Sequence, residues 1–133
     1  MAKKQIKQKS VKKSESMKEV TSGRVYVTAT FNNTLVTVTD AGGKVLFWST
    51  SGSSGFKGAR KATPFAAISA VETVAQKAKD IGMSSVEVYI KGPGPGRDAS
   101  VRALRNVGIN ITALADVTPI PHNGPRAKKR RRV

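Results

Sequence analysis

The sequence predicts one α/β domain with a mixed sheet, in the element order βββαβαβ, between two basic ends. Short alternations of apolar and polar residues, separated by turn residues, indicate strands in the first half of the body. Two longer segments repeat apolar residues at three- and four-residue steps, which indicates helices. A length of 133 residues allows a single domain with a modest core.

Three strands are expected between Gly23 and Thr50. The first strand alternates, and one of its faces consists of Val25, Val27, Ala29 and Phe31. Asn32-Asn33 forms a turn before the β-rich run 34–40, and Ala41-Gly42-Gly43 forms a turn before the run 45–50. Because both turns are short, the three strands should form an antiparallel meander.

The first helix is predicted to begin at Thr63-Pro64, where Thr suits the N-cap and Pro the first helical position. Gly82 is suited to the left-handed backbone conformation that commonly follows the last turn of a helix. The apolar face between these ends consists of Phe65, Ile68, Val71, Val74, Ala75, Ala78 and Ile81.

A fourth strand over 86–90 runs into the loop GPGPGRD, where Asp98 is expected to cap a short second helix. This helix should turn Val101, Leu104 and Val107 inward and end at Gly108. A fifth strand follows from Ile109 to about Ala115. Helical crossovers join parallel strands, so the sheet should be mixed, with the helices packed on it.

The charge is concentrated at the ends of the chain. There are 24 Lys and Arg against 8 Asp and Glu, a formal net charge of +16, and residues 1–20 and 126–133 together hold +11 of it. A polyanionic partner is therefore expected. We divide the chain into a basic, disordered N-terminal extension (1–22), a globular domain (23–118) and a Pro-rich basic tail (119–133). The sequence has no cysteine, no signal peptide and no long apolar run. We therefore expect a soluble protein that stays in the compartment where it is made.

The element order resembles the nuclease fold of ribonuclease H, which raises an enzymatic alternative. Two-metal hydrolysis needs carboxylates at the strand ends, but the first strand offers only Val, Tyr, Thr, Ala and Phe. The single His122 has no thiol in the chain and no carboxylate in its own loop. We therefore expect a non-enzymatic protein without cofactor or metal. An active nuclease and a DNA-compacting basic protein are the alternatives.

Two Gly-rich segments are candidate phosphate-binding loops. Gly92-Pro93-Gly94-Pro95-Gly96-Arg97 joins a strand to a helix start, where backbone N–H groups favour an anion, and Arg102 and Arg105 follow. In the segment 55–61, cations surround Phe56, which could stack on an unpaired base. A tight turn and a flexible linker with a core-anchoring Phe are the structural alternatives. Trp48 is expected in the core or on a sheet face rather than as a base platform.

Several motifs, in order along residues 23–133, resemble protein eleven of the small ribosomal subunit in its bacterial or organellar form. They are Phe31-Asn32-Asn33-Thr34, Val38-Thr39-Asp40, Gly55-Phe56-Lys57-Gly58, Gly92-Pro93-Gly94-Pro95-Gly96-Arg97, Asp116-Val117-Thr118-Pro119 and Pro121-His122-Asn123-Gly124, with the closing basic run. The chain departs from the family at 125–128, where the family usually has Cys and then Arg-Pro-Pro. Asn123-Gly124 also suggests isoaspartate formation, since Gly leaves the Asn side chain open to attack by the next backbone nitrogen.

The resemblance implies a ribonuclease H-like fold without its active site, on the platform of the small subunit. There the family binds small-subunit ribosomal RNA (rRNA), bridges several RNA helices and borders the cleft for the messenger's Shine-Dalgarno pairing. The implied neighbours are small-subunit proteins seven and eighteen, with initiation factor three nearby. The implied location is the ribosome of the cytoplasm, or of an organelle's stroma or matrix. Motifs and charge together give these candidate RNA-binding residues: Asn32, Asn33, Phe56, Lys57, Arg60, Lys61, Gly92, Gly94, Gly96, Arg97, Arg102, Arg105, His122, Asn123, Arg126, Lys128, Lys129, Arg130, Arg131 and Arg132.

Overall fold

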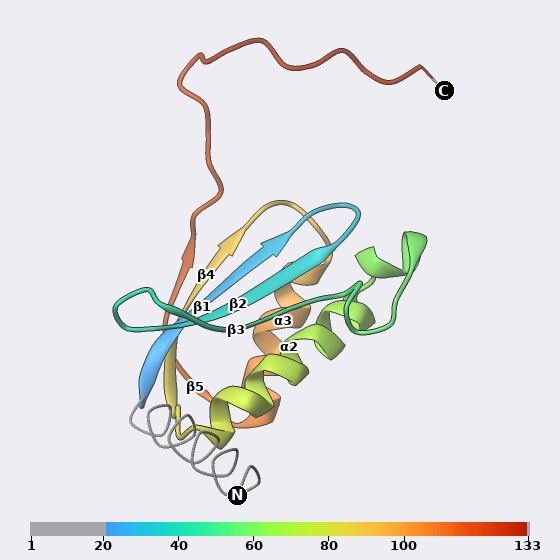
Figure 1. Cartoon of the computed structure of the whole chain (residues 1–133). Coiled ribbons are helices and arrows are strands. Elements are labelled where there is room, and N and C mark those ends of the chain that lie inside the picture. Colours follow the sequence, from blue (N-terminus) through green and yellow to red (C-terminus); the bar gives the residue numbers. More distant parts are fainter. Residues whose placement is uncertain (1–20, 133) are drawn as a thin grey trace, which may run out of the picture.

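A computed structural model of the chain describes residues 21–132 (Figure 1). The expected N-terminal extension, 1–22, therefore lies almost entirely outside the described residues, and the first strand begins at Ser22. The elements are β1 (Ser22–Ala29), β2 (Thr34–Asp40), β3 (Val45–Thr50), the 3-10 helix η1 (Gly58–Ala62), α2 (Pro64–Asp80), β4 (Ser85–Lys91), α3 (Gly96–Val107) and β5 (Asn110–Asp116). The predicted order βββαβαβ is confirmed, and η1 is an element that the sequence did not predict.

The five strands form one mixed sheet in the order β3-β2-β1-β4-β5. β1, β2 and β3 pair antiparallel, which confirms the meander, whereas β4 is parallel to β1 and β5 is parallel to β4. The crossovers through α2 and α3 are what permit the parallel pairs. The mixed α/β fold that the sequence predicted is therefore the fold of the protein.

Both helices pack on the same face of the sheet (Figure 1). The sheet contributes mainly valines from β1, β2 and β4, and α2 contributes Val71 and Val74 among small alanines. Because Ala side chains are short, α2 can lie close to the strands along most of its length. The core is therefore one layer between the sheet and the helix pair, which leaves the other sheet face without a helix among residues 21–132.

Three of the four predicted helix ends are confirmed. The Thr63 hydroxyl accepts a hydrogen bond from the Ala66 amide at 3.3 Å, and Pro64 is the first residue of α2. Gly82 and Gly108 follow α2 and α3 with φ angles of 93° and 96°, in the left-handed region that favours glycine. Local sequence signals thus set the start of α2 and the C-terminal ends of both helices.

Asp98 does not cap α3, contrary to the sequence prediction. The helix begins at Gly96, three residues earlier than a cap at Asp98 would give, with Pro95 at the N-cap position and no side-chain capping bond. Asp98 lies in the first helical turn, where its negative charge is favourable near the positive end of the helix dipole. The closely packed loop before the helix, described below, lets it begin earlier than the capping pattern predicted.

Two large apolar residues are more exposed than the periodicity suggested. Phe31 is 72% exposed because β1 ends at Ala29 and Phe31 belongs to the following turn. Phe65 is 67% exposed at the start of α2, so the buried stripe begins at Ala66. Trp48, expected in the core or on a sheet face, lies on the sheet face away from the helices and is 65% exposed. Among the described residues no helix is long and apolar enough to cross a membrane.

Candidate nucleic-acid interface

Strand direction brings several of the predicted site residues to one end of the sheet. β1, β4 and β5 are parallel, and β3 runs in the same direction as β1 because both are antiparallel to β2. The segments that follow these four strands therefore emerge at the same end. We call this the loop end: it consists of residues 30–33, 51–63 and 92–95 and the exit of the tail at Val117.

Two of its segments are in direct contact. The Gly94 amide donates a 2.9 Å hydrogen bond to the carbonyl of Ala29 at the end of β1. A Cβ atom at Gly94 would lie 2.2 Å from the carbonyl oxygen of Thr30, so only glycine permits this approach. In the turn 30–33, which Gly94 contacts, the side chain of Asn33 accepts a 2.8 Å hydrogen bond from the Thr34 amide, while Asn32 is exposed. The turn and the loop therefore form one packed unit.

Arg97 connects this unit to the last strand. One guanidinium nitrogen donates to the Gly92 carbonyl at 2.7 Å, and another pairs with the Asp116 carboxylate at 2.9 Å. The side chain is 32% exposed. Sequence reasoning placed Arg97 among the RNA-binding residues; the structure shows that its guanidinium also ties α3 to the end of β5.

The exit of the tail is fixed by Asp116 and Thr118. Asp116 accepts hydrogen bonds from both the amide and the hydroxyl of Thr118, at 3.0 Å and 2.6 Å. The Thr118 hydroxyl in turn accepts a 3.1 Å hydrogen bond from the Gly92 amide. Thr118 and Arg97 hold the pKa of the Asp116 carboxyl well below its usual range, because both stabilise the ionised form. The tail therefore leaves the body from a defined point.

Arg97, Arg102 and Arg105 line a groove of about 610 Å³ between α3 and β5. Leu114, 56% exposed, and Val101 contribute apolar lining. Asp98 and Asp116 also line the groove, but Asp116 is paired with Arg97. Arg102 and Arg105 are exposed on α3. We call this surface the arginine groove; its two exposed cations are Arg102 and Arg105.

The segment 55–61 is an ordered part of the loop end. Gly58–Ala62 form the 3-10 helix η1, and Gly55 and Gly58 adopt positive φ angles of 96° and 61°. The ring of Phe56 packs edge-on against Phe65, with centroids 5.7 Å apart. Lys57 and Arg60 are exposed and Lys61 is half-buried. Two cations are therefore available to a ligand here, whereas Phe56 already has an aromatic partner.

The tail runs away from the body in an extended path (Figure 1). Residues 119–132 belong to no helix or strand and all are exposed. His122 and Asn123 lie in its first part, and Asn123 has a positive φ of 55°. Six cations follow at Arg126, Lys128, Lys129, Arg130, Arg131 and Arg132. The tail thus presents its charge at a distance from the arginine groove.

Comparison with known proteins adds to this geometry. The family model described as ribosomal protein S11 matches residues 23–132. The chain belongs to this family. One curated member, small ribosomal subunit protein uS11 of Burkholderia cenocepacia (strain HI2424), is 58% identical over 116 residues, which are 87% of each of the two chains. The resemblance seen in the sequence motifs is confirmed, and family membership makes the chain a structural, non-enzymatic constituent of the ribosome.

Two acidic residues in the described part of the chain make structural contacts. Glu87 accepts a hydrogen bond from Tyr89 and pairs with Arg24, and Asp116 binds Arg97 and Thr118. Among residues 21–132 no three His, Asp or Glu side chains come together in a way that could hold a metal ion.

Proposed function

We propose that the chain is a structural constituent of the small ribosomal subunit that binds small-subunit rRNA through its loop end, arginine groove and tail. The observation that carries this proposal is the arrangement of cations: Arg102 and Arg105 line a groove next to the exit of a tail with six more. Phosphate contacts by Lys and Arg supply most of the affinity of such interfaces. Family membership supports the ribosome as the location.

The separation of the cationic surfaces supports binding to more than one RNA segment. The arginine groove lies between α3 and β5, Lys57 and Arg60 lie near the start of α2, and the tail extends away from both. A rigid body with an extended tail can hold two RNA helices at once. This is the basis for proposing that the protein bridges several rRNA helices.

The finer assignments are extensions of this proposal. We infer a place on the subunit platform, beside the cleft in which the messenger RNA forms Shine-Dalgarno pairing. Proteins seven and eighteen of the small subunit are the proposed neighbours, and initiation factor three is proposed to bind nearby. The proposed compartment is the cytoplasm, or the stroma or matrix of an organelle if the protein is organelle-encoded.

Replacing Arg102 and Arg105 together by Ala tests the arginine groove. The double variant should bind naked small-subunit rRNA about tenfold more weakly at moderate salt, and its log–log salt slope should fall by about 1 per lost phosphate contact. A matched control removes two exposed cations elsewhere, with Lys44→Ala and Lys77→Ala. Filter binding gives both quantities. Equal losses of rRNA affinity in the two double variants would show that only the total charge matters and that the arginine groove is not the RNA-binding site.

The DNA-compacting alternative is tested by location. Sucrose-gradient fractionation of a lysate should place the protein with small subunits. If it sedimented with nucleoid DNA and were absent from small subunits, the proposed function would be wrong whatever the effect of the arginine variants.

A further inference from the structure

Phe65, the second residue of α2, presents a large aromatic ring beside the loop end. Its side chain is 67% exposed, although the next two residues, Ala66 and Ala67, are fully buried. The ring is not part of the core between the helices and the sheet. Packing of the helix on the sheet therefore does not account for an aromatic residue at this position.

Phe56 supports this ring from one side. The centroids of the Phe56 and Phe65 rings are 5.7 Å apart and their planes are 80° apart, which is an edge-on contact. Such a contact covers at most one face of a ring. Phe56 is half-buried and Phe65 is exposed. The pair therefore holds the ring of Phe65 in place and leaves ring surface open to a planar ligand.

The ring and the cations before it belong to one ordered segment. The carbonyl of Arg60 accepts a 2.8 Å hydrogen bond from the Thr63 hydroxyl and a 3.3 Å hydrogen bond from the Thr63 amide. The same hydroxyl accepts the Ala66 amide. These bonds connect η1 to the first turn of α2. Lys57 and Arg60 are thus held near the ring by the backbone that lies between them.

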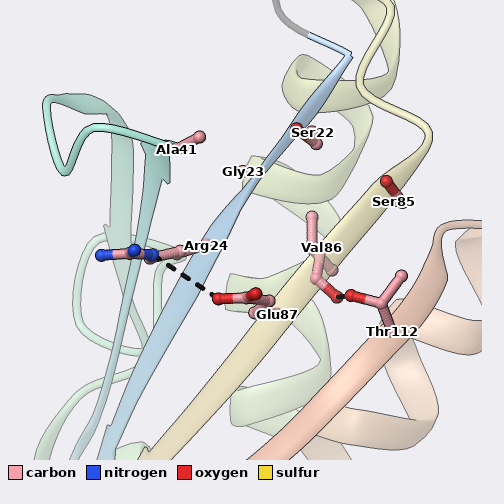
Figure 2. A pocket seen from close by; sticks show the side chains of 8 residues that line it. All are labelled: Ser22, Gly23, Arg24, Ala41, Ser85, Val86, Glu87 and Thr112. Atoms are coloured by element: carbon pink, nitrogen blue, oxygen red, sulfur yellow. Dashed lines mark hydrogen bonds and ion pairs between the residues drawn. The ribbon is translucent and has the colours of Figure 1, made fainter.

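A second pair of aromatic rings, Tyr26 and Tyr89, lies on the sheet and has a different electrostatic setting. Its rings stack with centroids 5.3 Å apart, and the Tyr89 hydroxyl donates a 2.8 Å hydrogen bond to Glu87. Figure 2 shows Arg24 and Glu87 pointing toward each other from β1 and β4, 3.6 Å apart, beside a small pocket of about 110 Å³. The cation beside the tyrosines is therefore already paired with a carboxylate.

The cations beside the Phe56–Phe65 pair are not paired in this way. Lys57 and Arg60 are exposed, and neither belongs to an ion pair among residues 21–132. Lys and Arg contacts to phosphate supply affinity for nucleic acid, and unpaired RNA bases are bound by stacking on aromatic side chains. Of the two aromatic pairs, the one at the start of α2 is therefore suited to RNA.

We propose that Phe65 stacks on an unpaired base of small-subunit rRNA, while Lys57 and Arg60 neutralise the phosphates beside that base. The occupant is a nucleotide in a loop or bulge, because a base inside an RNA helix is already stacked between its neighbours. This inference rests on the proposed function and deepens it. It gives the stacking role to Phe65 rather than to Phe56, which supports the ring.

Filter binding to naked small-subunit rRNA tests the stacking. Phe65→Leu keeps an apolar side chain but removes the ring, and it should bind at least about fivefold more weakly. Phe65→Tyr keeps the ring and should bind within about twofold of the parent. The log–log salt slope should be the same in both, because stacking releases no counterions. Parent affinity in Phe65→Leu, equal losses with Leu and Tyr, or a smaller slope in Phe65→Leu would overturn the proposal.

Trp48→Leu is the matched control for loss of an exposed aromatic ring. Trp48 is 65% exposed on the sheet face without helices, outside the cationic surfaces. This variant should bind naked small-subunit rRNA within about twofold of the parent. A loss equal to that of Phe65→Leu would show that affinity does not depend on the place of the ring, and the proposed site at Phe65 would be wrong.

Acylation of the RNA 2′-hydroxyl groups, at protein concentrations that saturate each variant, shows where the ring binds. A nucleotide held against Phe65 should be acylated less in complexes of the parent and of Phe65→Tyr, and normally in the complex of Phe65→Leu. Identical patterns for the parent and Phe65→Leu, or a change over the whole footprint, would contradict the proposal. Failure of the parent itself to bind the rRNA would instead contradict the proposed function.

Discussion

Single glycines control how the loop end is packed. Gly94 and Gly92 lie so close to the end of β1 that an added Cβ would meet backbone oxygen atoms at 2.2 Å and 2.3 Å. Gly92 also has a positive φ of 96°. A backbone neighbour cannot move aside as a flexible side chain can. The spacing of glycines in this loop is therefore required by packing, in addition to any contact with RNA.

Gly94→Ala should lower the free energy of unfolding by about 1 to 3 kcal/mol, because the new methyl group overlaps the carbonyl of Thr30. Gly42→Ala is the matched control: Gly42 is exposed in a turn, and its Cβ would meet only the Asp40 carboxylate at 3.4 Å. Urea unfolding followed by circular dichroism measures both. Similar losses in the two variants would contradict the packing argument.

Asp116 gives the protein a predictable response to acid. Its pKa in the folded state is depressed below the ordinary value of 3.8, so the ionised carboxylate stabilises the fold above that pH. As pH falls below 3.8 toward the folded pKa, this contribution is lost. Asp116→Asn should therefore unfold at lower urea than the parent at pH 7, and the difference should shrink in strong acid.

The control for this pH dependence is Glu72→Gln, on the exposed side of α2. Its urea midpoint should differ little from that of the parent at pH 7. A constant difference between Asp116→Asn and the parent from pH 7 down to about pH 2 would show that the Arg97–Asp116–Thr118 contacts do not depend on ionisation.

At the scale of elements, α2 depends on its first turn. The Thr63 hydroxyl accepts a hydrogen bond from the Ala66 amide and donates a 2.8 Å hydrogen bond to the carbonyl of Arg60. Thr63 therefore joins η1 to α2. This one residue positions the segment that carries Lys57 and Arg60 relative to the core. The cap therefore supports part of the proposed RNA-binding surface as well as the helix.

Thr63→Ala should lower the free energy of unfolding by about 1 kcal/mol, the usual cost of losing an N-cap. Thr73→Ala in the exposed middle of α2 is the matched control, and it should leave stability unchanged or slightly raised because Ala favours helix. Thermal unfolding measures the pair. A neutral Thr63→Ala would show that η1 and the packing of Ala66 and Ala67 hold the helix start without the cap.

For the whole molecule, charge is divided between a folded body and a tail. Deleting residues 119–133 keeps the Asp116–Thr118 contacts and should leave the unfolding midpoint of the body nearly unchanged. Binding to small-subunit rRNA should weaken, and the magnitude of its log–log salt slope should fall by about 0.7 to 0.9 for each phosphate contact removed. Filter binding between about 50 and 200 mM salt measures this. An unchanged slope would mean that the tail makes no phosphate contacts.

The sequence by itself determined the five strands, the two α-helices and most of their ends. Runs of β-forming residues between short turns located β2 and β3 to the residue, and Thr63, Pro64, Gly82 and Gly108 marked three of the four helix ends. These signals are local, since hydrogen bonds and φ preferences act within a few residues. Motifs in a fixed order were also sufficient to indicate the family.

Only the tertiary structure decided which faces and side chains were covered. Periodicity placed Phe31 and Phe65 on apolar faces, but both lie where their element ends, beyond the reach of the helix–sheet layer. The sequence left Trp48 either in the core or on a sheet face, and the structure places it on the sheet face away from the helices. The pairing of Arg97 with Asp116 joins residues from α3 and β5, and the meeting of Gly94 with Ala29 joins loops that are distant in sequence. Such contacts depend on strand order, which a local pattern does not encode.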